Sequence, residues 1–166
     1  FDTQKILGNY SISDFSVADN VLGDIEGILQ WNQKQEDVYL SLDLLEEDKK
    51  KVEISGLIFP FKEKNNLNLN AQINPIKLKL IQPYLKAYAS EFEGNFNGDI
   101  SITGDFDYPI LEGNINLNNS SFKYDYTQTT YFVNDKISLS KDKIIFDDVK
   151  LNDVLRNQGI LNGSLN

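Results

Sequence analysis

Apolar and polar residues alternate with period two along almost the whole chain, and this alternation predicts β-strands with one wet face. It is clearest between 23 and 31, where Ile25, Leu29 and Trp31 share one parity and acidic or amide side chains take the other. Further segments of this kind cover 38–45, 52–58, 67–73, 92–103, 110–118, 120–126, 129–133, 136–140, 143–151 and 158–165. Short turn sequences such as "DYPIL" and "NNSS" separate segments, which favours an antiparallel meander of about ten strands.

One segment, "NPIKLKLIQPYLKAYASEF", interrupts the alternation. Its later part has Leu85, Tyr88, Ala89 and Phe92 at helical spacing, and Pro83 suits a first helical turn. We therefore predict one short helix over 83–91.

Glycines fall on the parity that should carry the core, as "FEGNFNGDISITG" at 92–104 shows. Glycine inside a strand marks a bulge, a bend or a close backbone approach, and a strongly curled sheet needs such points. Removing side chains from the inner face would also leave an apolar trough, and the two interpretations are compatible. The glycines to which we assign this bending role are Gly27, Gly56, Gly94, Gly98, Gly104, Gly113 and Gly163.

These patterns together predict an all-β fold: a strongly curled antiparallel meander over residues 1–166, one section of a longer protein, with an open, taco-like groove. Alternation places large apolar side chains on the inner face. The residues predicted to line the groove are Ile25, Leu29, Trp31, Leu40, Leu42, Ile54, Leu69, Phe96, Ile100, Ile102, Leu111, Ile115, Leu117, Phe122, Tyr124, Leu139, Ile144 and Phe146.

Composition excludes several kinds of chemistry. The 166 residues include no Cys and no His, which removes thiolate and histidine catalysis and the usual zinc sites. A net charge of -9 argues against nucleic acid as a partner. Asp105 with Asp107, and Asp147 with Asp148, could form a calcium site or a glycosidase pair, but they lack the ligand pattern of a calcium loop. We expect solvated turn residues, no enzyme activity, no metal and no cofactor.

The predicted inner face lacks ordered polar groups, and this limits the kinds of ligand that it could bind. A sugar or nucleotide needs converging hydrogen-bond groups, whereas rows of Ile, Leu, Val and Phe suit an acyl chain. Such a chain of about 16 carbons carries about 12 kcal/mol of transfer free energy. Trp31, Tyr124, Tyr126 and Tyr131 could instead form a sugar-stacking platform, but the parity of Trp31 favours a core or groove position.

The second half of the chain, about residues 78 to 165, resembles the TamB family of translocation and assembly module subunits, related to the AsmA-like proteins. The resemblance rests on the F-x-G-x-F-x-G-x-I-x-I-x-G strand around Gly98 and on "PILEGNINL" after it. "SFKYDY" at 121–126 and "IIFDDVKLND" at 144–153 continue it in order.

This resemblance implies a periplasmic section of an inner-membrane-anchored protein of a diderm bacterium, without catalytic residues. The implied cargo is lipid acyl chains moving between membranes, or hydrophobic β-strands of outer-membrane proteins during assembly. An Omp85-type outer-membrane protein would be the partner, through regions outside this segment. The isolated segment could also dimerise through its edge strands. Two alternatives stay open: a closed β-sandwich of a surface or adhesin module without lipid, and a carboxylate glycosidase.

Overall fold

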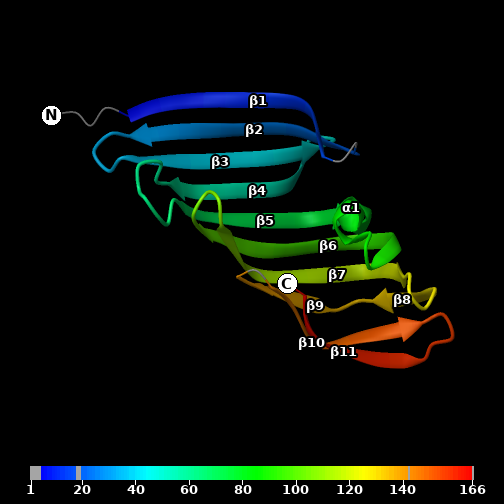
Figure 1. Ribbon diagram of the computed structural model, residues 1–166. Coiled ribbons are helices and arrows are strands. Elements are labelled where there is room, and N and C mark those ends of the chain that lie inside the picture. Colours follow the sequence, from blue (N-terminus) through cyan, green and yellow to red (C-terminus); the bar gives the residue numbers. More distant parts are fainter. Residues whose placement is uncertain (1–4, 18–19, 142, 166) are drawn as a thin grey trace. The chain divides into compact units, whose positions relative to one another are not determined.

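The computed structural model describes residues 5–17, 20–141 and 143–165, and about three quarters of them belong to one antiparallel sheet. The strands follow chain order from β1 to β8 and then β10 and β11, while β9 pairs with both β7 and β10 (Figure 1). The predicted all-β class and the antiparallel meander are confirmed. The strands are β1 (Lys5–Val17), β2 (Asn20–Asn32), β3 (Asp37–Glu46), β4 (Lys49–Ile58), β5 (Leu67–Lys77), β6 (Ala89–Gly104), β7 (Pro109–Tyr124), β8 (Thr129–Val133), β9 (Lys136–Ser140), β10 (Lys143–Asp153) and β11 (Gln158–Leu165).

The sheet divides into two compact units. The first unit takes the residues up to Ile73 together with Asp99–Glu112, so it contains β1 to β4, most of β5, and the end of β6. The second unit takes Asn74–Gly98 together with the residues from Gly113 onward. The sequence-based expectation of a single section over 1–166 stays a prediction, and each unit is described separately below.

In the first unit, strands β2 to β5 pair in a register that sets the predicted apolar positions opposite one another. Ile25 stands opposite Leu44, Leu44 opposite Val52, and Val52 opposite Ile73. Side chains directly opposite in neighbouring strands share a face of the sheet. Three more rows follow the same order: Gly27–Leu42–Ile54–Ala71, Leu29–Leu40–Gly56–Leu69 and Trp31–Val38–Ile58–Leu67.

Strand β1 adds an edge to this unit that the sequence analysis did not predict. Its Tyr10 and Ile12 stand opposite Gly27 and Ile25, so they continue the same rows. The alternation in β1 is blurred because Ile6 and Leu7 are adjacent and the register shifts between Ile12 and Phe15. Two apolar neighbours and a bulge leave no clean period of two.

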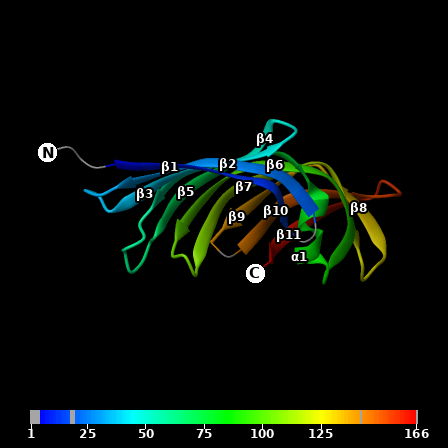
Figure 2. The same cartoon turned by 90° about the horizontal axis from the view of Figure 1, so that it is seen from above.

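In the second unit, a small core surrounds the start of β6. Leu78, Ala89 and Phe92 are buried, and Ile81, Leu85, Phe96, Leu117 and Phe122 pack around them. The helical part consists of a 3-10 turn, η1 (Leu78–Ile81), and α1 (Gln82–Leu85), which both views place at one end of β6 (Figure 1 and Figure 2).

The predicted helix is therefore real but shorter than expected, and its second half was wrong. The expected range was 83–91, whereas strand β6 already begins at Ala89. Ala89 and Phe92 bury their side chains against Leu78 from the strand. The side-chain oxygen of Gln82 also accepts a hydrogen bond from the Phe92 amide (3.4 Å). Their helical spacing to Leu85 was accidental.

Strand β7 corrects a second prediction, because "NNSS" is not a turn. The expected strands 110–118 and 120–126 form one strand, Pro109–Tyr124, which bulges at Asn119 with a φ of 47°. A bulge inserts one extra residue and reverses which parity faces the core. Leu117 and Phe122 consequently pack on the same core despite their opposite parity.

Candidate functional site

The candidate functional surface is the apolar face of β2 to β5, which we call the apolar ladder and define by the four cross-strand rows given above. Ile25, Leu44, Leu69 and Ala71 are buried, while most other members are half-buried. Leu29 is exposed, with 41% of its side chain accessible. A core closed by a second layer would bury all of these side chains. The ladder is therefore an apolar surface with accessible side chains.

The other predicted lining residues are distributed over both units. Ile100, Ile102 and Leu111 belong to the first unit; Phe96, Ile115, Leu117, Phe122, Tyr124, Leu139, Ile144 and Phe146 belong to the second. Leu111 and Tyr124 are exposed and the rest are half-buried. Register places Leu139 directly opposite Ile144, and Phe96, Leu117 and Phe122 gather on the core around Leu78. Their role as a groove lining stays a prediction.

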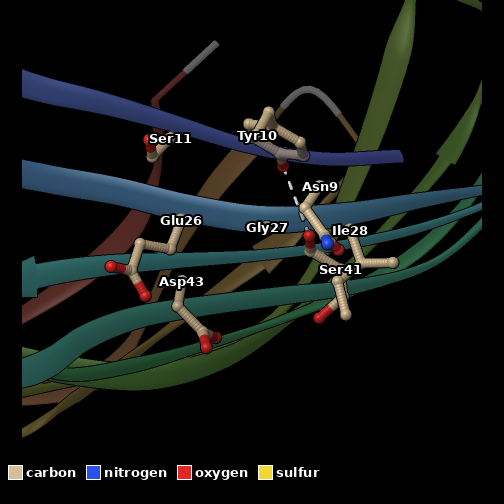
Figure 3. A pocket seen from close by; sticks show the side chains of 8 residues that line it. All are labelled: Asn9, Tyr10, Ser11, Glu26, Gly27, Ile28, Ser41 and Asp43. Atoms are coloured by element: carbon tan, nitrogen blue, oxygen red, sulfur yellow. Dashed lines mark hydrogen bonds between the residues drawn. The ribbon is translucent and has the colours of Figure 1, made fainter. Parts of the chain in front are cut away.

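The glycine in the middle of the ladder is covered by an aromatic ring. A Cβ added at Gly27 would lie 2.3 Å from the Tyr10 ring, and the Tyr10 hydroxyl donates a hydrogen bond to the Ser41 carbonyl oxygen (3.2 Å; Figure 3). Burial, and secondarily the nearby Asp43 carboxylate, raise the pKa of Tyr10. At this position the missing side chain is replaced by a ring from the edge strand.

Other inward glycines allow neighbouring backbones to approach. A Cβ at Gly56 would lie 2.2 Å from the Asn68 carbonyl oxygen, and one at Gly98 would lie 2.1 Å from that of Asn114. Real Cβ atoms do not tolerate such distances, so any larger residue would force the strands apart. The close-approach interpretation of strand glycines describes these sites; whether they bend a groove stays a prediction.

The Trp31 end of the ladder carries an aromatic residue that the sequence analysis missed. Phe61, in the loop between β4 and β5, meets the Trp31 ring edge-on with centroids 5.7 Å apart. The loop is closed by the Asn66 side chain, which donates to the carbonyl oxygens of Phe59 (3.0 Å) and Lys62 (2.6 Å). Only the fold reveals this contact, because Phe61 lies outside any alternating segment.

The opposite face of the same strands carries acidic and amide side chains together with Ile28, which lines a hollow there, and Tyr39, 41% and 42% exposed. A hollow of about 430 Å³ there is bordered by Asn9, Ser11, Glu26, Ser41 and Asp43 (Figure 3). Register sets Glu26 opposite Asp43 and Asp43 opposite Glu53, and the Lys50 ammonium bridges the last two at 3.0 and 2.9 Å. Those two carboxylates raise the pKa of Lys50.

The carboxylates considered as catalytic candidates lie at turns and bulges. The Asp105 carboxylate accepts a hydrogen bond from the Asn65 amide, and that of Asp148 accepts one from the Asn162 side chain (2.9 Å). In the described parts of the chain, no group of three or more acidic side chains is arranged to hold a metal ion. These carboxylates support turn geometry.

Comparison with known proteins gives one family. The model of the TamB C-terminal domain matches residues 40–158. No curated protein and no solved structure gave a significant match. Within the described residues, no helix is long and apolar enough to cross a bilayer.

Proposed function

The chain belongs to the TamB family, non-enzymatic components of translocation and assembly in the cell envelope, and from this premise we propose that its apolar ladder shields hydrophobic cargo. The cargo would be lipid acyl chains passing between the inner and outer membranes through the periplasm. β-Strands of outer-membrane proteins during assembly would use the same apolar surface. An Omp85-type partner would be met by other parts of the full-length protein.

The observation that supports this proposal is the register of β2 to β5. Four strands set four rows of apolar side chains on one face, which covers about 14 Å across the strands and about 20 Å along them. An extended apolar patch on the surface of a folded domain is often a functional site.

The chemistry of the ladder favours acyl chains over polar ligands. The one polar side-chain group in its four rows is the Trp31 indole N–H at one end, and the Tyr10 hydroxyl that comes from β1 is already bonded to the Ser41 carbonyl. Transfer of each methylene from water to such a surface is worth about 0.8 kcal/mol without any directional contact. Sugars and nucleotides need several converging donors and acceptors to replace their water, and the ladder offers only the Trp31 indole N–H.

A closed sandwich without lipid is the alternative. It would require a second layer over the ladder, and residues such as Leu29, Leu40 and Leu42 would then be fully buried. Leu29 is exposed and the other two are half-buried. This accessibility favours a surface that receives a ligand.

Trp31 provides a direct test, because it is the only tryptophan of the chain and sits at one end of the ladder. A monomeric brominated fatty acid quenches tryptophan fluorescence on contact, so we expect saturable quenching of Trp31. Leu40→Glu places a charge in the neighbouring row and should weaken this binding at least tenfold.

Tyr39→Glu is the matched control, since Tyr39 is adjacent in β3 and points to the opposite face. It should leave the quenching curve unchanged. If the unmodified chain shows no quenching, or if both variants lose it equally, the ladder is not the binding surface.

A further inference from the structure

Three turns at one end of the second unit expose large apolar and tyrosine side chains, and we call them the turn-end surface. They are the α1–β6 connection, the β7–β8 turn and the β10–β11 turn (Figure 1). Tyr126 is 89% exposed and Leu155 79%, the highest values among the large hydrophobic residues of this unit. The members of the turn-end surface are Tyr84, Tyr88, Tyr126, Val154 and Leu155.

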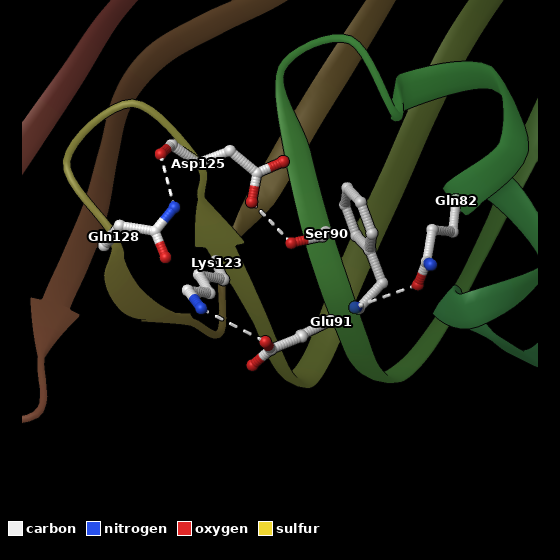
Figure 4. Close-up of polar contacts among 7 residues, drawn as sticks. Gln82, Ser90, Glu91, Lys123, Asp125 and Gln128 are labelled. Atoms are coloured by element: carbon white, nitrogen blue, oxygen red, sulfur yellow. Dashed lines mark hydrogen bonds and ion pairs between the residues drawn. The ribbon is translucent and has the colours of Figure 1, made fainter.

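Hydrogen bonds hold the first two turns together. The Asp125 amide donates to the Tyr88 carbonyl oxygen (3.4 Å), and the Ser90 hydroxyl donates to the Asp125 carboxylate. An ion pair between Lys123 and Glu91 (3.3 Å) ties the same two strands (Figure 4). The connection after α1 and the β7–β8 turn therefore form one continuous surface.

Strand pairing brings the third turn to the same place. Asp153, the last residue of β10, stands opposite Tyr131 of β8, which in turn stands opposite Phe122 of β7. The β10–β11 turn begins at the next residue. Val154 and Leu155 thus follow directly on a strand that pairs with β8, at the same end of the second unit as the β7–β8 turn that carries Tyr126 (Figure 1).

Backbone amides of the turn that carries Val154 and Leu155 already have hydrogen-bond partners within the turn. The Asp153 carboxylate accepts hydrogen bonds from the amides of Leu155 and Asn157, both at 2.8 Å, and from the Asn157 side chain (2.8 Å). The Arg156 amide donates to the Asp153 carbonyl (3.0 Å). An unbonded amide is costly to move into lipid, but these amides are already bonded inside the turn. Val154 and Leu155 are the apolar side chains of this turn, and Asp153, Arg156 and Asn157 beside them would have to stay in the headgroup layer.

The tyrosines and the charged residues of the turn-end surface indicate what kind of partner it suits. Tyrosine rings prefer the boundary between water and hydrocarbon, where the ring is buried and the hydroxyl stays wet. The acids of this surface, Glu91, Asp125 and Asp153, are matched in number by the cations Lys86, Lys123 and Arg156. A surface with balanced charges suits zwitterionic headgroups, so its aromatic and apolar side chains, not a net charge, are what favour a bilayer interface.

We propose that the turn-end surface binds the interfacial layer of a phospholipid bilayer, with Val154 and Leu155 inserted and the tyrosines at headgroup level. This adds a membrane contact to the chain that does not involve the ladder. A groove that handles lipid would gain from such a contact, because cargo must be exchanged at a membrane surface.

Flotation with large unilamellar vesicles of phosphatidylcholine tests this. We expect the 166-residue chain to float with the vesicles, and the double variant Val154→Glu with Leu155→Glu to partition about tenfold less. Val21→Glu is the matched control, because Val21 in β2 is 66% exposed and Val154 is 63% exposed. It should change partitioning less than twofold.

Two outcomes overturn the proposal: no flotation of the unmodified chain, or equal losses in the double variant and in Val21→Glu, both shown by thermal unfolding to be folded at the assay temperature. A double variant that loses cellular activity when the chain binds no vesicles would assign the surface to a protein partner instead. Quenching of Trp31 by monomeric brominated fatty acid should persist in the double variant. Failure of flotation with intact quenching would reject the membrane contact and leave the ladder proposal standing.

Discussion

Strands β2 to β5 of the first unit and strands β7 to β10 of the second obey the same alternation but differ in regularity. The β2–β3 and β4–β5 pairs run without any register shift and the β3–β4 pair shifts only at its end, between Leu44 and Leu45, so one parity marks one face through the four apolar rows. In β7 and β10, bulges at Asn119 and Asp148 interrupt the count, with φ values of 47° and 50°. The comparison teaches that parity predicts a face only between bulges.

The bulges share one construction. In each, the residue with positive φ donates its amide to an Asp or Asn side chain of an adjacent strand or strand break, so the amide freed from the ladder keeps a partner. A glycine with positive φ lies across from each bulge: Gly23, Gly94 and Gly163. The three bonds are Asp14 to Asp24 (3.0 Å), Asn119 to Asn134 (3.2 Å) and Asp148 to Asn162 (2.8 Å).

The break between β8 and β9 belongs to this construction. Asn134 bonds the bulge of β7, while the Asp135 carboxylate accepts from the amides of Lys150 (3.1 Å) and Lys136 (2.8 Å). β8 and β9 thus act as one strand, interrupted where its side chains are needed by both neighbours. Two of the three side-chain-bonded bulges therefore lie in the second unit, and the one in the first unit lies at its β1–β2 edge.

The largest effect should come from filling the glycine opposite the β7 bulge. A Cβ at Gly94 would lie 2.4 Å from the Asn119 carbonyl oxygen, and φ is +90°. Gly94→Ala should lower the free energy of unfolding by about 3 kcal/mol, from strain and displaced backbone together. Chemical denaturation measures this.

Gly159→Ala is the matched control for that substitution, because a Cβ there meets nothing within 4 Å. Its effect should stay within about 0.5 kcal/mol. Equal effects of the two substitutions would show that the bulge does not require glycine.

A smaller effect is expected from removing a bulge cap. Asn162→Ala deletes both bonds to Asp148 and should cost about 1 kcal/mol of stability, since the site is exposed and water replaces part of the loss. Asn68→Ala, at an exposed position of the regular strand β5, should cost less than about 0.5 kcal/mol. A cost at Asn68 as large as that at Asn162 would remove the distinction between the two regions.

The smallest effect is a pH dependence. Hydrogen bonds from the Lys150 and Lys136 amides lower the pKa of Asp135 below its ordinary value of 3.8. The stability that the ionised Asp135 gives to the folded state is therefore complete above pH 3.8 and is lost as the pH falls through the lower, folded-state pKa. Asp135→Asn should flatten the loss of stability below about pH 4. Melting temperatures of the unmodified chain and of Asp135→Asn, measured from pH 6 downward, check this. Identical decreases of the two melting temperatures with pH would contradict it.

Local periodicity accounts for what the sequence predicted well. Strands β8, β9 and β11 have the bounds that alternation predicts, and the four apolar sets of β2 to β5 do meet in rows. The sequence analysis extended the helix wrongly over 86–91, divided β7 into two strands and did not predict strand β1. Each of these depends on a bulge or on burial against a distant residue.

By itself, the sequence determined the all-β class, the faces of the regular strands and the TamB family, because period-two alternation and motif order are written into neighbouring residues. Only the tertiary structure decided that Tyr10 covers Gly27, that Phe61 meets Trp31 and that the connection after α1 meets the β7–β8 turn. The physical reason is that glycine space, bulge caps and turn contacts are set by the backbone of an adjacent strand. That strand can lie anywhere from ten to forty residues away, as the separations of Asp14 from Asp24 and of Asn65 from Asp105 show.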